Sequence, residues 1–107
     1  MAPVPPTYVD GAARRFRALG DPTRLRLLNA LHEARELSVG RLAERADTSV
    51  ANASKHLAQL EREGFIARRR EGTSVLYTIA DPAIDSLCDL VCSGLRARYA
   101  GLAELAG

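Results

Sequence analysis

Cys88 and Cys92 carry the two thiol groups of this chain, and they are the side chains best suited to bind a soft metal ion. They lie four positions apart, about one turn of a helix, so their sulfur atoms project from neighbouring parts of one face. Thiolates bind soft ions such as arsenite, cadmium or copper(I), and a close thiol pair can be oxidised or persulfidated. Because a disulfide within one helix would strain the bond, metal, metalloid or intersubunit chemistry is favoured over closure of this pair as a disulfide. The alternative is that both sulfurs pack as small apolar side chains.

Residues 49–58 form a second distinctive segment, because they contain hydrogen-bonding and basic side chains but no acid. In a DNA groove, Ser, Asn and Lys side chains can meet base edges or phosphates, whereas a carboxylate would be repelled. Each residue also has an ordinary structural explanation: Ser49 can cap a helix, Lys55 can face solvent, and His56 can be a core or edge histidine. The predicted DNA contacts are Ser49, Val50, Ala51, Asn52, Ser54, Lys55 and His56.

Arg68, Arg69 and Arg70 form the densest basic run of the sequence. They precede Glu71-Gly72-Thr73, which is typical of a turn between two strands. We therefore expect at least two of the three guanidinium groups to project from a hairpin towards a phosphate backbone or a minor groove. The alternative is a solvated charge run.

The helices that would carry these residues follow from apolar spacing and from the residues that start and stop helices. In the helix after Ser49, Ala53, Leu57 and Leu60 form the apolar stripe that is expected to pack on the rest of the domain, and the N-terminal half carries the acid-free segment that would enter a groove. The second helix has a broad apolar face, expected to consist of Leu25, Leu27, Leu28 and Leu31. Four helices are expected in all before the basic run: from an Asp10 cap to Gly20, from Asp21 to about Ala34, after Ser38, and from a Ser49 cap to Gly64.

After Gly64 the pattern changes from helical to alternating, which predicts a two-stranded hairpin, and Asp81-Pro82 then begins a last helix that reaches about Leu105. The fold class is therefore mainly α with a small β-hairpin, in the order α-α-α-α-β-β-α. This is the layout of a winged helix-turn-helix. Residues 1–9, with three prolines, are expected to form a flexible arm, and residues 10–107 one DNA-binding and dimerisation domain.

A length of 107 residues and an apolar content of 47% are typical of one small domain, which often gains stability from a partner subunit. The net charge of +2 does not by itself indicate a nucleic-acid partner, so that argument depends on where the arginines cluster. An enzyme is not expected, because the sequence has no Ser/His/acid set, no phosphate-binding glycine loop and no evident carboxylate pair. With two cysteines, no signal segment and no apolar run of about 18 residues, the chain is expected in the cytoplasm and not in a membrane.

Three stretches together resemble the ArsR/SmtB family of bacterial dimeric repressors: "ALGDPTRLRLLNAL", "SKHLAQLEREGFI" and "RREGTSVLYTIAD". The resemblance runs from about Phe16 to Leu95, and it identifies the three stretches with the family's second helix, recognition helix and wing. It implies a cytoplasmic homodimer on double-stranded DNA with an imperfect palindromic operator, from which an inducer releases it. Family dimers pair mainly through their first and last helices, which implies an interface at Phe16, Leu19, Ile84, Leu87, Val91 and Leu95.

The family's usual inducers are metal ions, metalloid ions or oxidising sulfur species. Its best-known metal site has two cysteines on the helix before the turn, where this chain has Ser38 and Gly40, and the last helix of this chain lacks histidine. Cys88 and Cys92 are therefore the expected sensing site, with a soft metal or metalloid ion as the implied ligand; a two-fold axis near the last helix would bring four sulfurs together. The alternatives are a repressor of the same fold without a ligand, and a winged-helix protein-interaction module.

Overall fold

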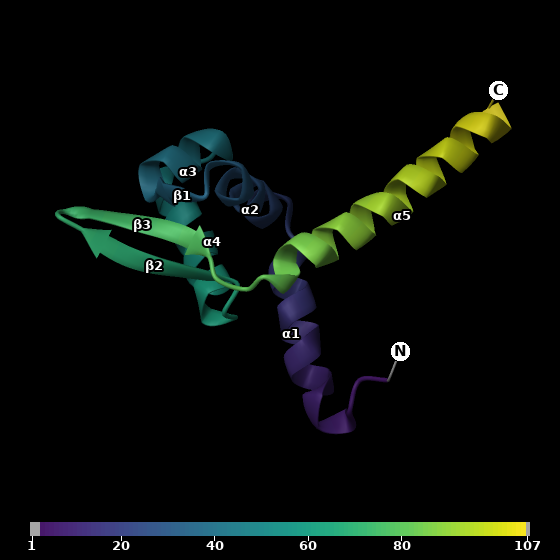
Figure 1. Ribbon diagram of the computed structural model, residues 1–107, viewed down its shortest axis with the longest axis horizontal. Coiled ribbons are helices and arrows are strands. Elements are labelled where there is room, and N and C mark those ends of the chain that lie inside the picture. The colour runs from purple at the N-terminus through teal and green to yellow at the C-terminus, as the bar shows by residue number, and fades with distance from the viewer. Residues whose placement is uncertain (1–2, 107) are drawn as a thin grey trace.

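The computed structural model describes residues 3–106, and it confirms the predicted fold class. A small antiparallel sheet lies against a group of helices, and the long α5 extends away from both (Figure 1). The elements in chain order are η1 (Pro6–Tyr8), α1 (Val9–Leu19), α2 (Pro22–Ala34), β1 (Glu36–Ser38), α3 (Val39–Arg45), α4 (Val50–Arg62), β2 (Ile66–Glu71), β3 (Ser74–Ile79) and α5 (Ala83–Ala106).

The sheet has a strand that the sequence did not predict. β1 pairs with β3 in antiparallel register, Leu37 opposite Tyr77, and the strand order within the described residues is β1-β3-β2. The predicted hairpin of β2 and β3 is confirmed, with Glu71 opposite Ser74 and a tight turn at Gly72, whose φ of 62° suits glycine. β1 attaches this hairpin to the chain between α2 and α3, so the wing is held at its base.

The beginning of the chain differs from the expectation. Of the arm predicted over residues 1–9, residues 1 and 2 lie outside the described residues, Pro6–Tyr8 form a single 3-10 turn, and Val9 already belongs to α1. The predicted Asp10 cap is wrong. Tyr8 occupies the N-cap position without a side-chain hydrogen bond. Asp10 lies in the first turn, where the positive end of the helix dipole stabilises its carboxylate.

The other predicted helix caps are confirmed, and each uses a side-chain oxygen that accepts a backbone N–H. Asp21 accepts from the Arg24 N–H at 3.0 Å, Ser38 from the Arg41 N–H at 3.4 Å, and Ser49 from the Asn52 N–H at 3.0 Å. α4 ends as predicted before Gly64, whose φ of 79° is left-handed. These local features set where α2, α3 and α4 begin and where α4 ends.

The core lies between α2, α3, α4 and the sheet. The predicted apolar face of α2 is confirmed at Leu27, Leu28 and Leu31 but is wrong at Leu25, which is 40% exposed. Two helical positions correspond to about 200°, so Leu25 lies on the opposite side of α2 from Leu27. The largest fully buried side chains are Phe65, Leu27, Leu31, Leu42, Leu57, Leu60 and Ile84.

Within the described part of the chain, no helix combines the length and the apolar composition needed to cross a bilayer.

Candidate nucleic-acid interface

The turn between α3 and α4 is fixed by hydrogen bonds at both of its ends. The Thr48 N–H donates to the Ala43 carbonyl at 3.0 Å, and the Asn52 side-chain amide donates to the Thr48 hydroxyl at 2.8 Å. Asp47 within the turn has a φ of 53°, a conformation that Asp tolerates better than most residues. The first turn of α4 is therefore held rigidly against α3, as a helix-turn-helix requires.

α4 has one buried side and one exposed side. Ala53, Leu57 and Leu60 are fully buried, as predicted. The opposite side carries one lysine, one arginine and no acid, and we call these residues the outer face of α4. Arg62 was not among the predicted contacts, although its position seven residues after Lys55 would have indicated the same face. The outer face consists of Ala51, Ser54, Lys55, Ala58 and Arg62.

The predicted DNA contacts divide into an exposed group and two residues engaged within the protein. Asn52 is half-buried and holds Thr48, and His56 lies on the side of α4 that faces α2. The positive end of the α4 dipole lies beside the exposed group, which suits a nearby phosphate. That group is Ser49, Val50, Ala51, Ser54 and Lys55.

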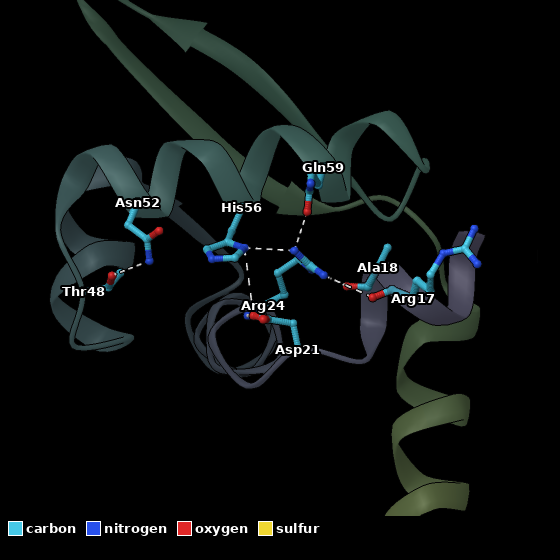
Figure 2. A network of polar contacts seen from close by, with 8 residues as sticks. All are labelled: Arg17, Ala18, Asp21, Arg24, Thr48, Asn52, His56 and Gln59. Atoms are coloured by element: carbon cyan, nitrogen blue, oxygen red, sulfur yellow. Dashed lines mark hydrogen bonds and ion pairs between the residues drawn. The ribbon is translucent and has the colours of Figure 1, made fainter. Parts of the chain in front are cut away.

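His56 belongs to an internal polar network, so the structure corrects its assignment as a DNA contact (Figure 2). Its side chain is only 16% exposed, and its Nδ1 lies 3.0 Å from an Arg24 guanidinium nitrogen. Because a guanidinium only donates hydrogen bonds, His56 accepts at Nδ1. The partner of His56 lies 32 positions away, so the spacing within α4 could not reveal it.

Arg24 connects three helices through this network (Figure 2). Its guanidinium donates to the Ala18 carbonyl at 2.6 Å and to the Arg17 carbonyl at 3.1 Å, both at the end of α1. It also donates to the Gln59 side chain of α4. The Arg24 backbone N–H, together with the nearby cationic side chain, lowers the pKa of Asp21. The position of α4 is thereby tied to the end of α1.

Replacing Arg24 by methionine is expected to lower the free energy of unfolding by about 2 kcal/mol, because several part-buried acceptors lose a charged donor. Arg24→Lys should not restore stability, since one ammonium group cannot reach acceptors on two other helices. Urea unfolding followed by circular dichroism measures both variants. Arg26→Met, on the exposed side of the same helix, is the matched control and should change stability by less than about 0.5 kcal/mol. An Arg24→Met chain as stable as the parent would contradict the prediction.

The three arginines of the wing make different contacts, because consecutive strand residues point to opposite sides of the sheet. Arg69 makes a two-pronged contact with Glu36 of β1 at 2.8 and 2.7 Å, and it lies 3.0 Å from Glu71. Hydrogen bonds from Arg69 lower the pKa of Glu36. Arg69 therefore links β2 to β1, but its side chain is 53% exposed, so its contact with a phosphate stays a prediction.

Arg68 and Arg70 share the side of the sheet to which Tyr77 and Val75 belong. Arg68 lies 3.3 Å from Glu61, so its side chain is directed towards α4. No carboxylate in the described ranges comes within ion-pair distance of Arg70. Arg70 is therefore the wing cation most available to a phosphate, and Arg68 adjoins α4.

The two cysteines lie where α5 leaves the body. Both are free; Cys88 is half-buried and Cys92 exposed, and they line a cavity of about 210 Å³ together with His32, Asp85 and Asp89. His32 Nδ1 lies 3.0 Å from an Asp85 oxygen. Burial raises the pKa of the Cys88 thiol, and Cys92 and the two carboxylates raise it further. Among the side chains described in a single chain, no three His, Cys, Asp or Glu residues are grouped to hold a metal ion.

The predicted interface residues fall into exposed and buried sets. Phe16 and Val91 are 66% and 63% exposed, and Leu95 is 42% exposed. Leu19 and Leu87 are half-buried and line a groove of about 190 Å³ between α1 and α5 with Phe16. Ile84 is only 2% exposed and belongs to the core of its own chain, so its assignment to a subunit interface is wrong. Apolar side chains that the prediction missed are exposed on α5 at Leu90, Tyr99 and Leu102.

Arg15 fixes α1 against the start of α5. Its guanidinium lies 2.6 Å from an Asp81 oxygen and 4.4 Å from the centre of the Phe65 ring. The pKa of the Asp81 carboxyl is lowered mainly by the hydrogen bond from the Ala83 N–H and also by the hydrogen bond from Arg15. The two helices that carry the exposed apolar residues are thereby held at a defined angle.

Comparisons with known proteins identify relatives over most of the chain. A family model described as a helix-turn-helix domain matches residues 19–69. The probable mercury resistance operon repressor of Streptomyces lividans is 40% identical over 86 residues, which are 80% of this chain and 68% of that protein. The HTH-type transcriptional regulator KmtR of Mycobacterium tuberculosis is 32% identical over 99 residues, 92% of this chain and 74% of that protein.

A solved structure supports the same relationship. The solution structure of a homodimeric winged helix-turn-helix DNA-binding domain from Mycobacterium bovis, described as a possible ArsR-family transcriptional regulator, matches with a TM-score of 0.78 at 29% identity. The match covers 92% of this chain and 94% of that domain.

Proposed function

Because this chain belongs to the ArsR-type winged helix-turn-helix transcriptional regulators, we propose that it is a homodimeric repressor of a palindromic operator. We also propose that a soft metal ion, a metalloid or a reactive sulfur species releases it from DNA through Cys88 and Cys92. The observation that carries the DNA-binding part is the outer face of α4, which is exposed, rigidly held and free of acids.

The outer face fits the major groove, which is about 12 Å wide and admits one α-helix. Ser54 and Lys55 offer a hydroxyl and an ammonium group to base edges or phosphates, while Val50 and Ala51 are small enough for close contact with thymine methyl groups. Arg70 on the wing has no carboxylate within ion-pair distance among the described residues, which leaves its guanidinium available to the phosphate backbone. These residues, with Ser49 at the helix cap, form the proposed DNA contact.

A dimer is proposed because large apolar side chains of α1 and α5 are exposed in the described chain, among them Phe16, Leu90 and Val91. The Mycobacterium bovis domain with the same fold is homodimeric. A two-fold axis near α1 and α5 would present two recognition helices to one duplex, and half-sites for such helices lie about 34 Å apart. Arg24 ties α4 to the end of α1, so a change in subunit orientation would move the recognition helix with it.

The DNA-binding proposal is tested by measuring binding of the purified chain to the duplex upstream of its own gene, in about 0.15 M salt. The expected result is a dimer that binds this duplex at least about 1000-fold more tightly than an unrelated duplex of equal length. The same measurement with scrambled half-sites locates the operator. If the chain shows no sequence preference at moderate salt, a winged-helix protein-interaction module is the better assignment.

The sensing proposal rests on the two thiols and their surroundings. Cys88, Cys92 and the neighbouring carboxylates of Asp85 and Asp89 would give a site rich in sulfur and negative charge, which favours soft cations. Because one chain does not group enough ligands, the two-fold axis would supply the second pair of thiols. The mercury resistance operon repressor of Streptomyces lividans is a relative named for a soft metal.

Soft ions are expected to weaken operator binding at least tenfold in the parent chain, and a Cys88→Ser/Cys92→Ser variant is expected to stay bound. Anisotropy of labelled operator is measured with reduced, metal-free protein during titration with mercury(II), cadmium, copper(I), arsenite, zinc, nickel or polysulfide. Serine preserves size but is a poor ligand for soft ions, so folding should be unaffected. If the serine variant responds like the parent, the thiol proposal is wrong. If no titrant releases the parent, the repressor without a ligand is the better assignment.

A further inference from the structure

A basic pocket lies on the other side of α4 from the wing. It is a hollow of about 310 Å³ between α1 and the C-terminal half of α4. Four arginines take part in its lining, with Glu63 as the acidic residue of this group. Among these lining residues, Arg62 is shared with the outer face of α4, and the others lie outside the DNA contact proposed above. The residues of interest in its lining are Arg14, Arg17, Arg24, Arg62, Gln59 and Glu63.

Three of these arginines have guanidinium groups that are not neutralised within the protein. Arg24 is occupied by its network, but no carboxylate among residues 3–106 lies within ion-pair distance of Arg14, Arg17 or Arg62. The Arg17 backbone carbonyl accepts from Arg24, while its side chain extends away from the network (Figure 2). Like charges held close together are unfavourable unless an anion binds between them.

The arginines of α1 lie on two different sides of the helix. Arg15 faces the body, where it pairs with Asp81 and lies over Phe65. Arg14 and Arg17, three positions apart, share the side of α1 that lines the basic pocket. Phe16 lies about 100 to 160° around the helix from them, so the apolar groove and the basic pocket are different surfaces.

The outer face of α4 has cationic residues on both of its borders. Glu61, on one border, contacts Arg68 of the wing. Gln59, on the other border, lines the basic pocket with Arg14 and Arg17. A helix in the major groove lies between two phosphate backbones, one on each side. The wing can reach one of these backbones, and the basic pocket is on the side of the other.

We propose that Arg14, Arg17 and Arg62 form a second phosphate-binding site, which holds the DNA backbone on the side of the recognition helix opposite the wing. The inference rests on the proposed DNA binding and adds to it a second line of phosphate contacts. The recognition helix is then clamped from both sides, by the wing and by α1. The predicted contacts of residues 49–56 and of the wing describe only one half of this arrangement.

The test compares Arg14→Gln/Arg17→Gln with the parent by measuring operator affinity at several salt concentrations. If each of the four arginines lost from the dimer contacts one phosphate, the slope of log K against log salt becomes less steep by about 3.6, from about 0.9 per phosphate. Affinity at 0.15 M salt should fall about 10- to 100-fold. The Arg17 backbone carbonyl is retained, so the Arg24 network stays intact. Arg14→Lys/Arg17→Lys keeps both charges and should keep most of the slope.

The matched control is Arg35→Gln/Arg96→Gln, which removes the same charge from two exposed positions that do not line the basic pocket. Its salt slope should equal that of the parent, with circular dichroism confirming that all variants are folded. An unchanged slope in Arg14→Gln/Arg17→Gln overturns the inference while leaving the DNA-binding proposal intact. Thermal stabilisation by inorganic phosphate is measured alongside the slope. If the slope is unchanged but the variant loses this stabilisation, the inference is also overturned, and the pocket is a site for small anions. If the parent binds no duplex at all, the DNA-binding proposal fails first and this inference fails with it.

Discussion

Reversing the charge at Lys55, in a Lys55→Glu variant, is expected to weaken operator binding at least about 100-fold without unfolding the protein. Lys55 is exposed in the middle of the outer face of α4, and no carboxylate in the described part of the chain lies within ion-pair distance of it. The glutamate would face phosphates, so each subunit would lose an attraction and gain a repulsion. A loss of about 1.4 kcal/mol in each of two subunits corresponds to this factor. Fluorescence anisotropy with labelled operator at about 0.15 M salt measures it.

Two further variants separate local contact from the overall charge of the protein. Arg96→Glu makes the same change of charge on the projecting part of α5 and should reduce affinity by less than about threefold. Lys55→Gln removes the cation without adding an anion and should fall between the parent and Lys55→Glu. Lys55→Glu binding as tightly as Arg96→Glu would mean that the outer face of α4 does not enter a groove.

The features that could be predicted from the sequence are those set by residues close together in the chain. Asp21, Ser38 and Ser49 each cap a helix by accepting the N–H three residues later, and Gly64 ends α4 in a left-handed conformation. The apolar period of α4 likewise predicts its buried side. The helix-turn-helix and its acid-free exposed side were predictable for this reason.

The features that were missed depend on partners far along the chain. β1 has three residues, too few for an alternating pattern, and it is a strand because β3 pairs with it 40 or so positions later. His56 is directed towards α2 by Arg24, and Arg69 is directed towards β1 by Glu36. In each case the side chain alone is compatible with DNA contact, and only the folded chain shows which partner it has.

Ile84 shows a different limit of apolar spacing. It belongs to the same helical stripe as Val91 and Leu95, and all three are apolar. The first turn of α5 packs on the body of its own chain, where Ile84 is buried, and the later turns extend beyond the body (Figure 1). Spacing identifies the stripe, but it cannot tell which part is covered by the same chain and which part is left for a partner.

Introducing charge into the exposed part of this stripe, with Val91→Asp/Leu95→Asp, is expected to convert the dimer into monomers and to weaken operator binding at least about 1000-fold. Val91 and Leu95 are 63% and 42% exposed in the single chain, so substitution should not disturb its core. A monomer contacts one half-site and loses the gain in affinity that comes from linking two contacts, which is typically 100- to 10,000-fold. Sedimentation velocity measures the association, and anisotropy with full and half operators measures the affinity.

The control for this variant adds the same two charges to the opposite side of α5. Ser86 and Ser93 are exposed, and Ser93 lies about 200° around the helix from Val91. Ser86→Asp/Ser93→Asp should therefore remain dimeric and bind the full operator like the parent. A Val91→Asp/Leu95→Asp chain that still sediments as a dimer would place the subunit contact elsewhere.

The dimer-breaking variant also tests whether the thiol site is shared between subunits. Within the described side chains of one chain, Cys88 and Cys92 do not meet a third ligand in suitable geometry. If two subunits together complete the site, the monomeric variant should bind cadmium at least about tenfold more weakly than the parent, although both thiols are still present. Cadmium binding of equal strength in monomer and dimer would mean that each chain binds the ion alone. The ion could then not act on the DNA-binding geometry by pulling the two copies of α5 together.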